Sequence, residues 1–192
     1  MTRYSLDVFL HITGAIAVFA GYGSLLLAVT AMRRAARSEQ IQGITSSLLA
    51  TRKIGAERIS VIDVVVIAGV LMIGVTGLDM ALTFHLTQAP WVDVATGSFI
   101  LLAPIGPLVV NPRLHRIADA AAVETGGPVS SALRSHLRDP LLTVVMGASL
   151  GILIGLVFLM TTKPDLVVSL VAMAIALAAG LALGWSITRR SA

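Results

Sequence analysis

Five long apolar segments constrain the fold of this chain more than any other feature of its sequence. A helix that crosses the roughly 30 Å hydrocarbon core of a bilayer needs about 20 largely apolar residues, because its backbone must satisfy its own hydrogen bonds. The segments that fit are residues 6–32, 60–84, 94–110, 141–160 and 166–188, and the last two contain no charged side chain. The sequence therefore predicts an all-α integral membrane bundle of five transmembrane helices, with residues 1–192 forming a single domain.

The composition supports a membrane protein and excludes several other classes. Hydrophobic residues make up 56% of the chain and charged residues only 12%, which is unlike a soluble domain of this size. The net charge of +4 does not indicate a nucleic-acid partner, because the basic residues lie in the segments that flank the apolar runs. Since the chain has no cysteine, a disulfide framework, a thiolate metal site and an iron–sulfur cluster are excluded.

The distribution of basic residues predicts the orientation of the spans. Residues 33–59, residues 111–140 and the C-terminal tail contain twelve of the fourteen Lys and Arg, and only Arg3 and Lys163 lie on the other side. Because cytoplasmic loops are enriched in Lys and Arg, we expect the N-terminus outside and the C-terminus in the cytoplasm. The chain is then a multi-pass protein of the cell's inner (plasma) membrane, with 33–59 and 111–140 as cytoplasmic loops.

The first apolar segment has an alternative interpretation as a cleaved signal peptide. Its apolar run is longer than the usual h-region of 7 to 15 residues, and Arg33 and Arg34 follow it directly. This arrangement is typical of a stop-transfer segment and favours a retained span.

The third segment and the two cytoplasmic loops contain further structural features. Pro104 and Pro107 remove backbone donors and should kink the third helix. Residues 111–140 contain two amphipathic stretches with Arg and His, separated by the "GGP" at 126–128. Basic amphipathic helices beside a membrane favour anionic lipids. They can equally be helices that continue the spans beyond the membrane surface.

Small residues recur every four positions on the last two spans. They are Gly147, Gly151 and Gly155 on the fourth span, and Ala172, Ala176, Gly180 and Gly184 on the fifth. Such stripes let helix backbones approach closely. The short "TTKPD" connection at 161–165 favours packing of the two stripes against each other, and a homodimer seam is the alternative.

Ionisable residues within the spans are costly, and each is therefore a candidate functional group. Counting along the predicted helices places Asp7, His11, Asp79 and His85 in one layer near the outer boundary. Asp7 and His11 are four residues apart on one helical face, where a carboxylate can orient an imidazole, as it does beside metal-bound histidine. The alternative is that both simply lie in the hydrated interface.

Two aspartates on the second span have different expected environments. Asp63 lies close in sequence to Arg58 at the cytoplasmic boundary, where it should pair or be solvated. Asp79 shares a face with Thr76 and Thr83 and has no Lys or Arg close in sequence. If Asp79 is buried, we expect it either to stay protonated more readily than usual or to have a partner such as His11.

The sequence resembles a family of small bacterial membrane proteins of unknown function. The resemblance rests on "FLHITGAIAVFAG" in the first span, the basic residues after that span, "GVTGLDMAL" in the second, and Trp91 before the third. These patterns are distantly similar to the copper-resistance-D-like and HemJ-like membrane proteins. In the latter, a histidine in an "LH" motif on the first helix is a haem ligand, and His11 is the matching position. The resemblance implies haem or metal binding near the outer half of the bundle, with a redox role.

Three hypotheses for the function follow. In the first, His11 binds haem, Asp7 orients it, and His85 or Met80 is the second axial ligand; copper would use the ligands His11, Met80 and His85. In the second, the chain is a small permease or export component in which Asp79 and the third span line a path. In the third, it is a non-catalytic membrane scaffold. The sequence contains no phosphate-binding glycine loop, nucleophile elbow or HExxH, so it assigns no enzymatic reaction.

Overall fold

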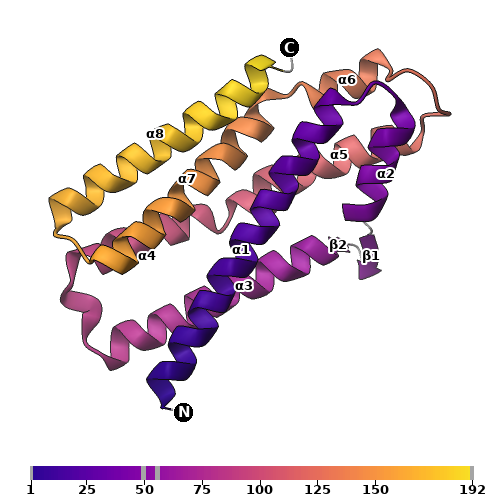
Figure 1. The fold of residues 1–192 in the computed structure, drawn as a ribbon. Helices are drawn as coiled ribbons and strands as arrows, with labels where there is room; N and C mark the ends of the chain where they lie inside the picture. Colours follow the sequence, from indigo (N-terminus) through magenta and orange to yellow (C-terminus); the bar gives the residue numbers. More distant parts are fainter. Residues whose placement is uncertain (1, 49–50, 55–56, 191–192) are drawn as a thin grey trace.

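The computed structural model describes residues 2–48, 51–54 and 57–190, and within these ranges the chain consists of helices, the turns that connect them and one short hairpin (Figure 1). The helices in chain order are α1 (Arg3–Arg34), α2 (Ser38–Leu48), α3 (Val61–Thr83), α4 (Pro90–Leu102), α5 (Asn111–Ala122), α6 (Ser131–Leu137), α7 (Pro140–Thr162) and α8 (Leu166–Arg190). Two single turns, η1 (Leu86–Gln88) and η2 (Gly106–Val110), flank α4, and the strands are β1 (Thr51–Ile54) and β2 (Glu57–Ser60).

Five helical stretches in the described residues are long and apolar enough to cross a membrane. They are Arg3–Arg34, Val61–Thr83, Pro90–Ala122, Ser131–Thr162 and Leu166–Arg189. The predicted apolar segments are thereby confirmed. The third and fourth stretches are longer than predicted, because α5 and α6 extend them into the polar region between residues 111 and 140.

The bundle is built from two helix pairs, α1 with α3 and α7 with α8 (Figure 1). The α1–α3 pair is closest at Gly14 and Gly69, where a Cβ added to either glycine would lie 2.8 Å from the backbone carbonyl oxygen of the other. In the α7–α8 pair a Cβ at Gly151 would lie 3.0 Å from the Cα of Gly180. The predicted small-residue stripes of α7 and α8 therefore contact each other within the chain.

The third span is interrupted by the predicted proline break. Residues 106–110 form a π turn, η2, between α4 and α5, and the segment contains Pro107. The hydroxyl of Tyr22 lies near this turn, 3.2 Å from where a Cβ on Gly106 would be. It also lies close to the side chain of Ser149 on α7, whose hydroxyl donates to the Val145 carbonyl at 2.9 Å. The break thus lies next to a polar contact between α1 and α7.

The connection between the first two spans contains secondary structure that the sequence does not predict. β1 and β2 pair antiparallel, with Thr51 opposite Ser60 and Ile54 opposite Glu57. Before them, α2 packs on the segment after α5: the amide of Ser38 donates to the Gly127 carbonyl at 2.9 Å, and the side-chain amide of Gln42 donates to the Ala121 carbonyl at 2.8 Å.

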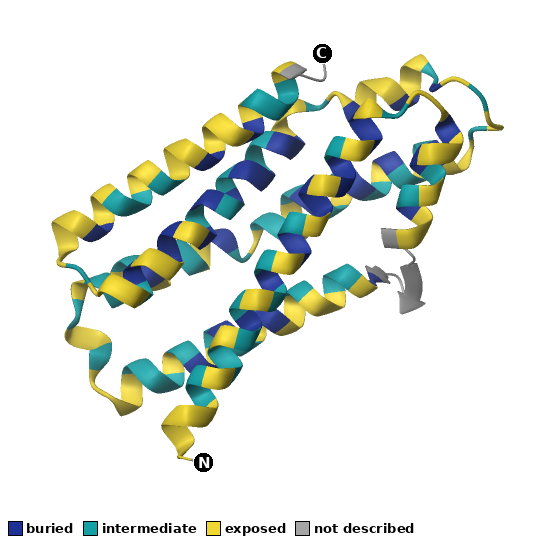
Figure 2. Ribbon diagram, in the orientation of Figure 1, coloured by how far each residue is buried: buried dark blue, intermediate teal, exposed yellow. Residues whose placement is uncertain are grey.

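The core consists of two clusters of buried apolar side chains. One joins the C-terminal half of α1 to α2, α5, α6 and the start of α7, and the other joins the middle of α1 to α3, α4 and the end of α7. Many of the large exposed apolar side chains belong to α3, α4 and α8. Figure 2 shows exposed residues along much of α3 and α8. A helix that is apolar on its exposed side as well as its buried side is typical of a membrane span.

Candidate functional site

The end of the bundle where α1 begins and α3 ends contains a cluster of polar side chains, here called the N-terminal cluster: Arg3, Asp7, His11, Thr76 and Asp79. The guanidinium of Arg3 forms a two-point ion pair with Asp79, with its Nε donating to Oδ2 at 3.2 Å and its Nη2 donating to Oδ1. The side chain of Asp79 is 27% exposed and that of Arg3 is 71% exposed. This pair links the first turn of α1 to the last turn of α3.

The carboxyl group of Asp7 lies beside that of Asp79 and near the charge of Arg3. Its Oδ2 is buried and has no hydrogen-bond partner among the described residues. Two neighbouring ionised carboxylates repel each other, so the arrangement is stabilised when one of them carries a proton or a cation lies beside them. The two carboxyl groups and Arg3 therefore form a site that can hold and release a proton.

One turn further along α1, the ring of His11 faces α3. Its Nδ1 is 3.1 Å from the hydroxyl oxygen of Thr76, and that hydroxyl donates its only proton to the Met72 carbonyl at 2.5 Å. With the Thr76 proton on the Met72 carbonyl, Nδ1 is the donor and Nε2 the acceptor of the neutral ring, which also lies beside the Ile73 carbonyl. Further along α1, beyond His11, the backbones of α1 and α3 are in contact at Gly14 and Gly69.

The structure brings some predicted site residues together and separates others. His11, Asp7 and Asp79 lie in the N-terminal cluster, where Asp7 lies beside Asp79 and His11 bonds Thr76. His85 is exposed and has the left-handed backbone conformation at φ 53° in the turn after α3. The ring of His11 lies against Gly77, so at a rise of about 1.5 Å per residue the end of α3 at Thr83 is already ~9 Å further along the axis, and His85 follows it.

Met80 is half-buried on α3, one turn beyond Thr76 toward the end of the helix. No group of three His, Cys, Asp or Glu that could hold a metal ion occurs in the part of the chain that the structure describes. Of the predicted ligands, His11 alone has a ring nitrogen whose availability is fixed by a hydrogen bond on the opposite nitrogen.

Asp63 lies at the opposite end of α3 and has a structural role. The Ser60 hydroxyl accepts from the Asp63 amide at 3.1 Å, and the Asp63 carboxylate accepts from the Ser60 amide at 2.9 Å, which together make a capping box. Its second oxygen accepts from the side-chain amide of Asn111 at 3.0 Å. This carboxylate therefore fixes the start of α3 against the start of α5.

Sequence reasoning did not place Arg3 or Thr76 in the site. Arg3 and Asp79 are separated by 76 positions, and their pairing depends on the antiparallel contact of α1 with α3. Thr76 shares the face of Asp79, and that spacing was the only feature of the sequence that pointed to it. No protein-family model, curated protein or solved structure matches this chain.

Proposed function

We propose that this chain is a five-span protein of the inner (plasma) membrane, with its N-terminus outside, that acts as a small proton-coupled permease or export component. Five apolar helices and an apolar outer surface support the membrane location. Twelve of the fourteen Lys and Arg lie at or beyond the ends of the spans opposite the N-terminus, which supports the orientation. The N-terminal cluster then opens to the outside.

The observation on which the coupling rests is that the carboxyl group of Asp7 lies near that of Asp79, which pairs with the guanidinium of Arg3. Ionisable groups within spans mark proton and substrate paths by default, because an isolated charge there is costly. A proton arriving from outside is shared by the two carboxyl groups, and Nε2 of His11 is the next acceptor along α1. The contact between Gly14 and Gly69 closes the seam below, so the proton stays in the outer half until the helices move.

The break in the third span supplies an element that can move. Discontinuous helices at membrane depth are tolerated where the freed backbone lines a cavity or meets polar partners, and they occur at transporter sites. Here η2 meets the Tyr22 hydroxyl, and α4 contacts both α7 and α8. A hinge at residues 103–110 would let the outer half of the third span move relative to α5.

The proposal is tested by proton flux into proteoliposomes that contain a fluorescent pH indicator. Under an imposed membrane potential, wild-type protein should acidify the lumen in the presence of a transported solute, with a panel of amino acids, sugars and organic ions as probes. Asp79→Asn should abolish this flux, because it removes the shared proton and the charge that pairs with Arg3. The matched control is Asp93→Asn, since Asp93 is exposed in the first turn of α4. Absence of flux for the whole panel, or equal flux in Asp79→Asn and wild type, would contradict the proposal.

A second function is favoured by the hydrogen-bonding state of His11. Metal-bound histidines usually donate one ring N–H to a fixed acceptor and bind through the other nitrogen. Thr76 is such an acceptor, so Nε2 of His11 would be the atom that holds haem if haem binds here. The separation of His85 from His11 does not fit a haem held by both. Bound haem would supply redox chemistry to the outer end of the bundle.

The haem hypothesis is tested by oxidised and dithionite-reduced absorption spectra of the protein purified after expression with a haem precursor. A Soret band should be present in wild type and absent in His11→Ala. His115→Ala on α5 is the control, since His115 belongs to the opposite end of the bundle. A colourless wild-type protein, or a spectrum unchanged in His11→Ala, would reject this role.

A further inference from the structure

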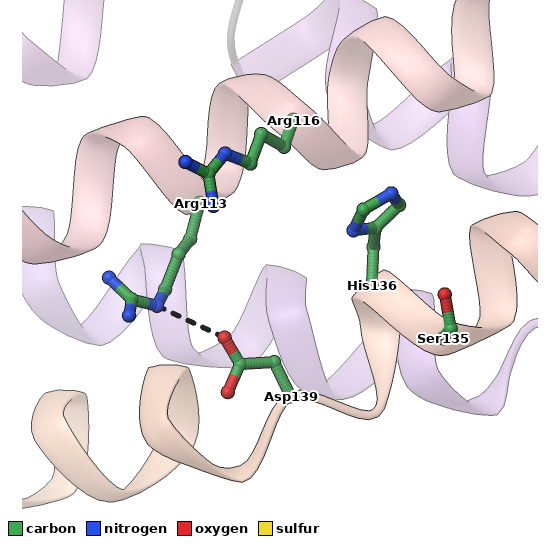
Figure 3. A pocket seen from close by; sticks show the side chains of 5 residues that line it. All are labelled: Arg113, Arg116, Ser135, His136 and Asp139. Atoms are coloured by element: carbon green, nitrogen blue, oxygen red, sulfur yellow. Dashed lines mark hydrogen bonds and ion pairs between the residues drawn. The ribbon is translucent and has the colours of Figure 1, made fainter.

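A pocket of about 240 Å³ lies at the end of the bundle opposite the N-terminal cluster, between α5 and the junction of α6 with α7 (Figure 3). Its lining consists of Arg113, Arg116, Ser135, His136 and Asp139. In Figure 3 the ring of His136 points from α6 toward α5, and the side chains of Arg113 and Arg116 lie across from it. Neither of the two proposed functions uses this pocket.

The local sequence fixes the geometry of the pocket. Ser130 caps α6 by accepting from the Leu133 amide at 3.2 Å, and Asp139 caps α7 by accepting from the Leu141 amide at 2.9 Å. Arg33, buried at the end of α1, holds the turn between these helices: its Nε donates to the Leu137 carbonyl at 2.6 Å and its Nη2 to the Asp139 carbonyl at 2.9 Å. The turn between α6 and α7, which forms one side of the pocket, is therefore attached to the end of α1.

The charges around the pocket do not balance. Asp139 is the lone carboxylate in the lining, and its Oδ2 already accepts from Nε of Arg113 at 3.0 Å. Arg116 is exposed, and no described residue hydrogen-bonds its guanidinium. Arg33 is only 9% exposed, makes hydrogen bonds to carbonyl oxygens, and leaves Nη1 buried without a partner among the described residues. Arg33 lies behind the pocket lining, near the charge of Asp139. The lining itself holds two guanidinium groups and one carboxylate, so an added anion would be stabilised there.

We propose that this pocket binds the phosphate group of an anionic phospholipid. The volume is below the roughly 300–1,000 Å³ of pockets for drug-sized ligands and suits a single headgroup. Guanidinium groups bind phosphate in a forked geometry, and the Ser135 hydroxyl and the His136 ring add donors. The pocket lies directly beside the first apolar turn of α7, so a headgroup bound there leaves its acyl chains in the hydrocarbon layer. This placement rests on the proposed orientation in the membrane and is independent of transport and of haem.

The test measures binding to the full-length protein in mild detergent. Dioleoyl phosphatidylglycerol is titrated, with dioleoyl phosphatidylcholine as the zwitterionic comparison and inorganic phosphate as the soluble one. Wild-type protein should bind phosphatidylglycerol with preference over phosphatidylcholine. Arg116→Gln should weaken that binding roughly tenfold, as expected for one lost charge-assisted contact.

Arg134→Gln is the matched control, because Arg134 is an exposed arginine on α6 outside the pocket lining. It should bind like wild type. His136→Gln gives a second loss of binding that is independent of any effect of Arg116→Gln on folding, and circular dichroism checks the fold of each variant.

Binding of inorganic phosphate alone, with the same dependence on Arg116, would overturn the lipid as the source of the anion. Equal weakening in Arg116→Gln and Arg134→Gln, or no preference for phosphatidylglycerol, would overturn the site. Because transport and haem are not measured, failure of this site leaves the proposed function separately testable.

Discussion

The imidazole of His11 donates to the hydroxyl of Thr76 across the contact between α1 and α3, over 3.1 Å. The Thr76 hydroxyl donates its own proton to the Met72 carbonyl, so its oxygen accepts the proton of the His11 ring. A threonine on one helix thus determines which nitrogen of a histidine on another helix is available. Proton transfer and haem ligation would both use that nitrogen.

Replacing Thr76 by Val tests this relationship. The change keeps the shape of the side chain but leaves the buried Nδ1–H of His11 without its acceptor, so the free energy of unfolding should fall by about 1 kcal/mol. Thermal unfolding in detergent measures the loss, and ¹⁵N chemical shifts of the imidazole report the tautomer. Thr83→Val, at the exposed end of α3, is the control. A His11 ring that keeps its Nδ1–H tautomer in Thr76→Val would show that another group sets it.

Adding one methyl group at Gly151 should destabilise the α7–α8 pair. The new Cβ would lie 3.0 Å from the Cα of Gly180, so Gly151→Ala should cost about 1–3 kcal/mol through overpacking. Gly97→Ala is the matched control, since nothing lies within 4 Å of a Cβ at that position. Melting temperatures of both variants make the comparison. If Gly151→Ala melts like wild type and instead loses a dimer on size-exclusion chromatography, the stripe functions between two copies.

The attachment of α2 to the segment after α5 should weaken in acid. Glu39 accepts from Nε of Arg37 at 3.0 Å and from the amide of Gly127 at 3.1 Å, and these partners lower its pKa to about 2. A carboxylate whose pKa is lowered in the folded state stabilises that state fully above the unfolded pKa near 4.5, and this stabilisation is lost as pH falls from there toward 2.

Hydrogen exchange of the α2 amides measures this effect. At pH 7 they should exchange faster in Glu39→Gln than in wild type, and the difference should shrink as the pH falls from about 4.5 toward 2. Gly126 and Gly127 have φ of +94° and +101°, a backbone conformation that glycine adopts without strain, so the Gly127 amide is held in position. A difference that stays constant from pH 7 to pH 2.5 would exclude the carboxylate as its cause.

Removing the cap of α3 should loosen the end of that helix. Asp63→Ala breaks one half of the capping box and the bond from Asn111, and we expect a loss of about 1–2 kcal/mol in the free energy of unfolding. Asp63→Asn is the comparison, because its carbonyl oxygen can still accept from the Ser60 amide. If the two variants were equally destabilised, the charge of Asp63, rather than its acceptor oxygen, would be responsible.

The sequence predicted the apolar spans, because apolar length is fixed by counting. Asp7, His11 and Asp79 lie at one end of the bundle as expected, whereas His85 lies beyond the end of α3. The sequence could not predict the rotation of each helix about its axis. Asp7 and His11 share a face, yet Asp7 lies beside Asp79 while His11 bonds Thr76. Which partner each finds depends on how α1 turns against α3, and that is set by the backbone contact of Gly14 with Gly69.

The polar connections were less predictable than the spans, for a different reason. The strands β1 and β2 are four residues each, too short for a pattern of alternation to be distinctive. The pocket between α5 and α6 joins residues from two helices and depends on Arg33, which the sequence indicated only as a residue that ends the first span. Its hydrogen bonds reach carbonyl groups more than 100 positions away.

The π turn at Gly106–Val110 determines the direction about the helix axis in which the side chains of α5 point. One additional residue in a turn rotates the downstream helix by about 100° relative to an uninterrupted α-helix. With this offset, Leu114, Ile117 and Ala121 lie in the core while Arg113 and Arg116 face α6. Deleting a single residue within 106–110 would turn the arginines away from His136 and bring charge toward the apolar core. A backbone insertion in the middle of the span therefore determines where the positive charge lies at its end.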